Sequence, residues 1–457
     1  MPDSPLDLAD LPAIEGDVLD DEPALAAAAR DWGHIVQARP RAVVRAASAA
    51  DVAAVVEFAA ARGVPVAPRG AGHSPFGQCQ ADGGIVLDLT GLARVHGGEG
   101  DTLVVDAGAR WQRVLGATLP RGLTPPVLTD YLELTVGGTL SVGGLGGASH
   151  HHGAQTDTIT ELEVVTGTGE LVRCSAEHHS DLFDAVRAGL GQCGIITRAT
   201  VRLRPARQRA RRRQLYYDSL GTFLADARTV VKDGRFDYVE GQLILDDDSG
   251  TWRHMLEATS YFSLPHDLDE AALLGDLADD RDAAESEEMT YHGFLDRMAD
   301  GETVLREEGS WFHPHPWLNV FLPDDEVADV VTETLAATEG ADLGDSGLVM
   351  LYPIRADRLS TPLLRVPSSE LVWLFALLRT GRPYDPEGVA RMIRLNAELA
   401  ERVRPLGGTV YPVNSMPMTP HDWKDHFGGA WDALETAKRT YDPHGVLTPG
   451  QGVFAPG

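Results

Sequence analysis

Cysteine is nearly absent from this sequence, and long apolar runs are missing altogether. The three cysteines among 457 residues, Cys79, Cys174 and Cys193, form no C-x-x-C pair and are odd in number. A disulfide framework and a cysteine-based zinc site are therefore not expected. No stretch of about 18 apolar residues occurs, so we expect no transmembrane helix.

Basic residues are also scarce. The chain has 39 lysines and arginines against 68 acidic residues, which gives a formal net charge of −29. This charge argues against nucleic acid as a partner, because phosphates favour a basic surface. The acidic N-terminal stretch lacks the basic and apolar regions of a signal peptide. We therefore expect a cytoplasmic protein.

Strand and short-helix patterns alternate up to Pro205, where the composition changes. Strands are predicted at 41–46, 64–68, 83–90, 102–109 and 194–205, a hairpin at 161–175, a helix after Ser48 that ends near Gly63, and a capped helix at 180–189. The chain then continues with the basic patch ARQRARRRQ, longer helical patterns and an acidic insert near 265–290. The tail contains an amphipathic helix at 422–441 and ends in a Pro-, Gly- and Gln-rich turn that we expect to pack against a site.

Glycine is concentrated in two clusters, PRGAGHS (68–74) and TVGGTLSVGGLGGASHHHG (135–153). Bare backbone approaches a ligand closely, and successive N–H groups bind anions. Together the clusters favour a nucleotide site over ordinary tight turns. GLGQCG (189–194) matches the dinucleotide pattern G-x-G-x-x-G, but a helix precedes it and a strand follows it, which is the reverse of a Rossmann site.

His73 stands in the first cluster between Gly72 and Ser74. An unhindered imidazole beside a phosphate cradle is a packing residue, a general base or a point of covalent attachment. The composition does not choose among these three roles.

Several ordered motifs resemble the cytokinin dehydrogenases, within the wider family of FAD-dependent oxidases that share the vanillyl-alcohol oxidase fold. They are RGAGHS, TDYLELTVGGTLSVGGLGG, HHGAQTDTITELEVVTGTGELVRCS, SDLFDAVRAGLGQCGIITRA, HPWLNVFLP and YDPHGVLTPGQGVF. The resemblance implies an α+β protein with a two-lobed PCMH-type FAD-binding domain built from residues 1–205 and 406–457. An α+β substrate-binding domain, residues 206–405, is inserted between these segments.

The resemblance also implies FAD bonded covalently to His73. Relatives with a second, cysteinyl bond have a cysteine where this chain has Glu133, so one bond is expected. The implied cofactor-binding residues are Arg69, Gly70, Ala71, Gly72, His73, Ser74, Gln78, Asp130, Thr135, Gly137, Gly138, Ser141, Gly144, Gly147, Ile195, Tyr411 and Gln451.

The implied catalytic residues are Asp130 and Glu257. Asp130 matches the aspartate that accepts the proton of the substrate amine; taken alone, it is an ordinary turn residue. Glu257 matches the glutamate that binds the purine edge; taken alone, it is an exposed strand residue. Trp317 and Asn319 match residues that line the substrate pocket and support the aspartate. Pro412, next to Tyr411, is also placed in the substrate pocket.

This sequence departs from the family pattern at three places: PVNSMPMTP after Tyr411, the acidic insert, and the triplet His150, His151 and His152. Adjacent histidines in a glycine-rich loop do not easily face one ion, so no metal site is expected.

The chemistry implied by the resemblance is transfer of a hydride to flavin N5 while the aspartate takes the amine proton. The resulting imine is hydrolysed to an amine and an aldehyde, and a quinone-like acceptor or oxygen reoxidises the flavin. Two alternatives remain open. One is a related flavin oxidase acting on an alcohol, a sugar or a secondary-metabolite intermediate, and the other is a flavin-binding protein without turnover.

Overall fold

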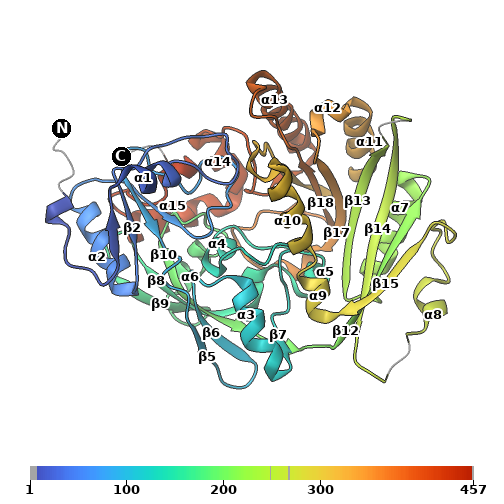
Figure 1. Ribbon diagram of the computed structural model, residues 1–457, viewed down its shortest axis with the longest axis horizontal. Helices are drawn as coiled ribbons and strands as arrows, with labels where there is room; N and C mark the ends of the chain where they lie inside the picture. The colour runs from blue at the N-terminus through green and yellow to red at the C-terminus, as the bar shows by residue number, and fades with distance from the viewer. Residues whose placement is uncertain (1–7, 247–248, 266–267, 455–457) are drawn as a thin grey trace.

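The computed structural model describes residues 8–246, 249–265 and 268–454, so Asp267, at the start of the acidic insert, lies outside the described residues. Within these ranges the strands form sheets of four, five, two and eight strands. The four- and five-stranded sheets lie in one half of the molecule, and the eight-stranded sheet lies in the other (Figure 1). In the same ranges, no helix is long and apolar enough to cross a membrane.

The four-stranded sheet has the order β1-β2-β4-β3, and both β2 and β3 run parallel to β4. Its strands are β1 (Asp17–Leu19), β2 (Ala42–Arg45), β3 (Val66–Arg69) and β4 (Ile85–Asp88). Helix α2 (Ala49–Ala60) begins after Ser48, whose Oγ accepts a hydrogen bond of 3.2 Å from the Asp51 N–H, as the sequence predicts. Because β3 ends at Arg69, the first glycine cluster starts at a fixed point at the edge of this sheet.

The five-stranded sheet is antiparallel, with the order β5-β6-β10-β8-β9. Its strands are β5 (Val95–Gly97), β6 (Thr102–Asp106), β8 (Ile159–Val165), β9 (Leu171–Ser175) and β10 (Ile195–Arg202). The predicted hairpin is confirmed as β8 and β9. The predicted cap of α6 (Ser180–Val186) is wrong: the helix starts after His179, which has a φ of 47° and makes no capping hydrogen bond within the described chain.

Shorter elements complete this half. They are α1 (Glu22–Ala28), α3 (Trp111–Thr118), α4 (Val136–Leu140), α5 (Ser149–His152), β7 (Leu123–Thr124) and β11 (Arg204–Pro205). Short 3-10 turns occur along the whole of the described chain, at Leu8–Asp10, Leu119–Arg121, Gln155–Thr158, Ser310–Phe312, Ala356–Arg358, Arg404–Leu406, Gly428–Ala430 and Pro449–Gln451.

The eight-stranded sheet, called the large sheet below, is antiparallel throughout, with the order β15-β12-β14-β13-β17-β18-β16-β19 within the described chain. Its strands are β12 (Arg209–Tyr217), β13 (Tyr238–Asp246), β14 (Thr251–Phe262), β15 (Glu285–Thr290), β16 (Leu318–Pro323), β17 (Leu348–Arg355), β18 (Leu371–Leu378) and β19 (Thr409–Val410). The sequence predicts longer helices between residues 206 and 405. The structure contains such helices, and the large sheet lies at the centre of this region.

The two faces of the large sheet have different neighbours, because alternate residues of a strand point to opposite faces. On β18, Trp373 and Phe375 join the core cluster of the helices on the outer face, while Leu374 joins the core of the other half of the molecule. The outer helices of this cluster are α7 (Leu220–Asp233), α11 (Val327–Ala337) and α13 (Pro386–Val403). The remaining helices are α8 (Glu270–Leu274), α9 (Tyr291–Leu295), α10 (Met298–Glu308) and α12 (Gly340–Leu343). The inner face of the sheet is thus directed toward the glycine clusters.

The basic patch and the acidic insert neutralise each other at one edge of the large sheet. The patch is part of β12, and the insert supplies α8 and the neighbouring strand β15. Arg211 and Arg213 both bind Glu270, at 3.1 Å and 2.6 Å, and Arg211 also binds Glu288 at 2.9 Å. These arginines therefore serve the packing of this edge.

The C-terminal segment contacts both halves of the molecule. Strand β19 pairs with β16 of the large sheet, and the Thr448 N–H donates to the Val66 carbonyl at 2.9 Å. The expected return of the tail to the site is confirmed, because Gln451 lies in the cavity lining described below. The single helix predicted at 422–441 is wrong: α14 (Pro420–Phe427) and α15 (Trp431–Tyr441) are separated at Gly428, whose φ of 49° interrupts the helix. The two boundaries between the predicted segments 1–205, 206–405 and 406–457 remain predictions.

Candidate active site

A cavity of about 530 Å³ lies between the glycine clusters and the inner face of the large sheet. Most of the residues predicted from the sequence come together in its wall. They are Arg69, Gly70, Ala71, Gly72, His73, Ser74, Gln78, Asp130, Thr135, Gly137, Gly138, Ser141, Gly144, Ile195, Glu257, Trp317, Asn319, Tyr411, Pro412 and Gln451. Gly147, although within the described chain, is not part of this wall; a Cβ there would meet the Tyr238 ring at 2.5 Å.

The glycines of the two clusters are required by close approach and by backbone conformation. Gly72 and Gly144 have φ values of +68° and +75°, in the left-handed region that favours glycine. A Cβ on Gly70 would come within 2.0 Å of the Thr135 Oγ1, so the two clusters touch each other at this point. The result is a wall of bare backbone at one end of the cavity.

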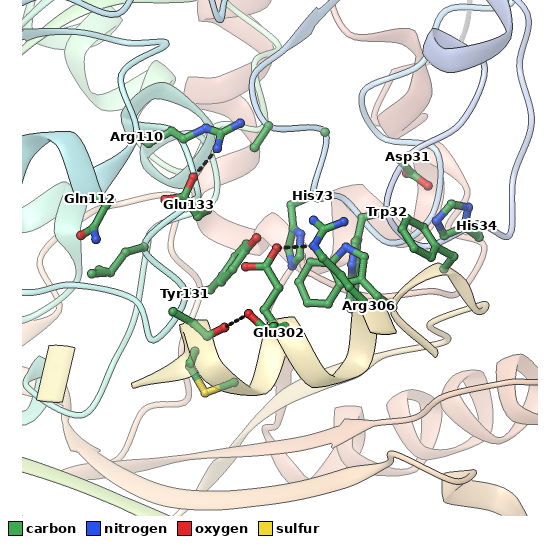
Figure 2. Close-up of a pocket in the computed structure, with 18 of the residues that line it drawn as sticks. Asp31, Trp32, His34, His73, Arg110, Gln112, Tyr131, Glu133, Glu302 and Arg306 are labelled. Atoms are coloured by element: carbon green, nitrogen blue, oxygen red, sulfur yellow. Dashed lines mark hydrogen bonds and ion pairs between the residues drawn. The ribbon is translucent and has the colours of Figure 1, made fainter. Parts of the chain in front are cut away.

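His73 lies where this cavity meets a second cavity of about 890 Å³, since its side chain lines both. Its ring stacks on Trp32, with centroids 4.2 Å apart, and lies 5.0 Å from the Tyr131 ring. Figure 2 shows these rings beside the Arg306–Glu302 ion pair of α10. Desolvation, with a smaller contribution from Arg306, lowers the pKa of His73 to about 3. The imidazole is therefore neutral at physiological pH and has a nitrogen lone pair free to react.

Asp130 has two charged or polar partners from distant parts of the chain. Its Oδ1 accepts hydrogen bonds from the Arg297 guanidinium at 2.8 Å and from the Tyr238 hydroxyl. Burial raises the pKa of Tyr238 well above 10, so this hydroxyl keeps its proton and remains a donor. These two hydrogen bonds fix the orientation of the Asp130 carboxyl group in the cavity.

Two further carboxyl groups lie on the large sheet near Asp130. Glu257 is 3% exposed, and its Oε2 accepts a 2.6 Å hydrogen bond from Arg212. Glu240 is 4% exposed and lies directly opposite Glu257 on the neighbouring strand. Arg297 comes within 3.5 Å of Glu257 and 3.8 Å of Glu240. One end of the cavity therefore gathers three carboxyl groups and two guanidinium groups.

The C-terminal segment closes the cavity from another side. The N–H of Gly144 donates to the Tyr411 hydroxyl at 3.2 Å, which joins this segment to the second glycine cluster. The Asn319 side-chain amide donates to the Val413 carbonyl. Tyr238 and Arg297 are the observed hydrogen-bond donors to Asp130, and the predicted support of Asp130 by Asn319 stays a prediction.

The positions where the sequence departs from the family have ordinary local partners. Glu133 forms an ion pair with Arg110, and both lie in the second cavity (Figure 2). His150 and His151 each direct a ring nitrogen to the Phe236 carbonyl, at 3.0 Å and 2.9 Å. In the described part of the chain, no group of three or more His, Cys, Asp or Glu side chains is arranged so that it could hold a metal ion.

Sequence analysis missed the side chains that surround Asp130. Tyr238, Glu240 and Gln242 alternate with Val239, Gly241 and Leu243, which is the period-2 pattern of a strand with one polar face. This pattern could have indicated a polar wall. Arg212 was visible only as part of the basic patch, and Arg297 gave no local signal.

The residues of the cavity fit a flavin dinucleotide. The glycine clusters provide bare backbone with N–H groups for a pyrophosphate. A Cβ on Gly138 would meet only the Thr135 Oγ1 within 4 Å among the described atoms, so the wall there is open to a ligand. The residues that would hold the cofactor are those of both clusters together with Ile195, Tyr411 and Gln451.

Comparisons with known proteins agree with this fit. A family model described as "FAD binding domain" matches residues 40–175, and one described as "Cytokinin dehydrogenase 1, FAD and cytokinin binding" matches residues 251–454. The crystal structure of 6-hydroxy-D-nicotine oxidase from Arthrobacter nicotinovorans has a TM-score of 0.72 and 23% identity, and covers 95% of this chain and 96% of the oxidase. It shows that the fold is of the PCMH type.

Curated relatives match over nearly the whole chain. An uncharacterized oxidoreductase, ORF5 in the fasciation locus of Rhodococcoides fascians, is 45% identical, over 94% of this chain and 97% of the relative. Cytokinin dehydrogenases 6 and 7 of Oryza sativa subsp. japonica are each 36% identical, over 95% of this chain and 91% of each relative. The chain therefore belongs to the cytokinin dehydrogenase family and is an FAD-dependent oxidoreductase.

Proposed function

We propose that this protein oxidises the C–N bond of an N6-substituted adenine or a similar amine, with FAD held covalently by His73. One observation carries the proposal: Asp130, Trp317 and Glu257 line the same cavity as the glycine clusters. A proton acceptor, an aromatic wall and a polar group for a ring edge thus lie next to the cofactor-binding residues. The rice relatives are cytokinin dehydrogenases, which supports the same substrate class.

In this mechanism Asp130 accepts the proton of the substrate amine. Arg297 and Tyr238 fix the orientation of its carboxylate, and the aromatic ring of Trp317 packs against the substrate. Bound FAD supplies the two-electron acceptor that takes a hydride from the substrate carbon. The substrate becomes an imine, which water hydrolyses to an amine and an aldehyde. Glu257 holds the far edge of the substrate so that the reacting bond stays beside Asp130.

Covalent attachment through His73 is supported by the chemical state of its ring. A neutral imidazole is the nucleophilic form, and the pKa of His73, lowered to about 3, keeps it in that form. Acid-precipitated protein should therefore stay yellow, and a peptide containing His73 should carry the mass of FAD. His73→Ala should bind FAD that is released on denaturation. Flavin released from fully loaded wild-type protein would contradict the attachment.

Anaerobic stopped-flow spectroscopy tests the reaction. The holoenzyme is mixed with isopentenyladenine, with hexoses and with simple alcohols, and the flavin absorbance is followed. Bleaching by isopentenyladenine, with adenine and an unsaturated aldehyde as products, is the expected result. Bleaching by an alcohol or a hexose alone would overturn the proposal, and no bleaching by any substrate would favour a binding protein without turnover.

The second candidate is oxidation of an alcohol, a sugar or a secondary-metabolite intermediate. It is favoured by the segment after Tyr411, because Pro412 and Val413 of this altered stretch line the cavity. The electron acceptor, a quinone-like compound or oxygen, is identified by following reoxidation of the reduced holoenzyme with each in turn. The cytoplasmic location stays a prediction.

A further inference from the structure

Glu240 occupies a position that the mechanism above does not use. It lies on β13 directly opposite Glu257 on β14, in an antiparallel pair, so both side chains stand on the same face of the large sheet. Both line the cavity, and both are at least nine-tenths buried. The Oε1 atoms of Glu240 and Glu257 are buried and have no hydrogen-bond partner among the residues that the structure describes.

The cations nearby do not neutralise all of the carboxyl groups. Arg212 binds Glu257 at 2.6 Å, and Arg297 binds Asp130 at 2.8 Å. Glu240 has only the more distant contact with Arg297, at 3.8 Å. Like charges directly opposite each other on neighbouring strands destabilise a sheet. Protonation of one carboxyl group relieves this repulsion. Glu240 has the weakest cationic partner of the three carboxyl groups, so it is the one that holds the proton.

Burial and the neighbouring carboxyl groups favour the protonated form of Glu240. Tyr238 faces Glu240 from the same strand, Glu257 from β14 and Tyr352 from β17. Asp130 faces it from the loop between β7 and α4, and Arg297 from the junction between α9 and α10. Burial, followed by the charge of Asp130, raises the pKa of Glu240 well above 4.5. Among the described residues, Arg297 and the Tyr238 hydroxyl lower the pKa of Glu240, but they do not offset burial and the charge of Asp130.

We propose that Glu240 is a specificity-determining residue that binds the substrate as a neutral carboxylic acid, donating its O–H to a ring nitrogen while Glu257 accepts a neighbouring N–H. A protonated carboxyl is a donor, whereas a carboxylate only accepts. The two facing glutamates thus form a donor and an acceptor side by side. They fit a heteroaromatic edge in which a ring nitrogen stands next to an N–H, as in a purine with an unsubstituted imidazole ring. This inference rests on the proposed function.

Binding of adenine to the holoenzyme tests the inference separately from turnover, because adenine has no side chain to oxidise. Calorimetry compares adenine with 3-deazaadenine, 7-deazaadenine and 9-methyladenine, each of which lacks one donor or acceptor. The wild type should bind one of the deaza analogues about tenfold more weakly than adenine, the usual worth of one hydrogen bond. In Glu240→Leu this preference should disappear, since the donor is gone.

Glu240→Gln keeps a donor and removes the titrating proton. It should retain most of the adenine affinity at neutral pH, and the affinity should not fall at alkaline pH, where wild-type Glu240 loses its proton. An infrared difference spectrum between the wild type and Glu240→Gln should show the C=O stretch of a protonated carboxyl. Glu163→Gln changes a buried glutamate of β8 that is not part of the cavity lining; it is the matched control and should leave all affinities unchanged.

The outcomes separate this inference from the proposed function. If isopentenyladenine bleaches the flavin but the Glu240 variants keep every wild-type affinity ratio, the inference is wrong and the function stands. If adenine binds with the Glu240-dependent preference but no bleaching occurs, the inference stands and the function is wrong. Three results would each overturn the proposal that Glu240 is a neutral donor. They are an equal loss of affinity in Glu240→Gln and Glu240→Leu, the absence of the protonated C=O band, and the absence of adenine binding.

Discussion

The two ends of the cavity are built in opposite ways. The glycine end, formed by residues 69–74 and 135–145, presents bare backbone and a neutral histidine. The charged end, on the inner face of the large sheet, brings together Asp130, Glu240, Glu257, Arg212 and Arg297. A wall of backbone fits a cofactor that many substrates share, whereas a buried set of charges recognises one arrangement of donors and acceptors. Chemical selectivity is therefore expected to come mainly from the charged end.

The largest effect is expected for Asp130→Asn, which keeps the shape of the side chain and removes the proton acceptor. Flavin reduction in the holoenzyme should slow by about 10²–10⁴-fold, the usual contribution of a positioned base. FAD loading should remain normal, because the glycine end is untouched. Stopped-flow bleaching without an electron acceptor isolates this step. Bleaching at the wild-type rate would show that Asp130 is structural and that the two ends do not divide the work as proposed.

Arg297→Met tests how strongly the charged end depends on its central cation. The Arg297 side chain is 15% exposed and contacts all three carboxyl groups. Its removal leaves the Asp130 carboxyl, whose side chain is 27% exposed, without its cationic partner, and breaking a largely buried pair of this kind typically costs about 3–5 kcal/mol in the free energy of unfolding. Urea unfolding of the holoenzyme measures this cost. The double variant Arg297→Met with Asp130→Asn should recover part of the loss; full additivity of the two single effects would contradict the ion pair.

The glycine end could be predicted from the sequence because its signal is local. Gly72, His73 and Gly144 stand in short stretches whose composition alone indicates close backbone approach to a ligand. The strands and α2 of this half were also visible, since each is determined by a periodic pattern and a nearby cap. The break at Gly428 was missed, because a glycine in an amphipathic pattern is compatible with a continuous helix until tertiary packing interrupts it.

The charged end could not be predicted in the same way, because it depends on strand register. Glu240 and Glu257 face each other only through the pairing of β13 with β14, and Arg297 reaches Asp130 from 167 positions along the chain. The resemblance indicated Asp130 and Glu257 but not their partners. The orientation of the Asn319 amide toward Val413 is likewise a consequence of packing in three dimensions.

A pH-dependent effect is expected at the glycine end. His315 is 6% exposed and stacks on Trp32, with centroids 3.7 Å apart. Burial, followed by nearby His73, lowers the pKa of His315 from 6.5 to about 3. The unfolded chain then binds more protons than the folded protein between these two values. The free energy of unfolding should therefore fall as the pH drops through this window, by on the order of a few kcal/mol in total.

Urea unfolding from neutral pH into the lower part of the window checks this expectation. His315→Phe keeps an aromatic ring against Trp32 and should flatten the pH dependence. His421→Phe changes an exposed histidine and should leave the dependence as in the wild type. Equal pH dependence in the wild type and His315→Phe would show that His315 does not remain neutral in the folded protein.

The smallest effect is expected for Glu257→Gln, because glutamine keeps the shape and one acceptor while the charge is lost. Glu257 uses its Oε2 for Arg212, so its Oε1 is the atom available to a substrate N–H. Loss of a charged hydrogen bond should weaken substrate capture by about 1–3 kcal/mol. The change should appear as a higher KM for isopentenyladenine with a smaller change in kcat, since Glu257 holds the far edge and not the reacting bond.

Glu163→Gln removes a buried, arginine-paired carboxylate outside the cavity and should leave KM unchanged. The contrary result is a Glu257→Gln variant with unchanged KM whose kcat falls as strongly as that of Asp130→Asn. Glu257 would then act at the reacting bond, and the role of base would have to be assigned to Glu257 in place of Asp130.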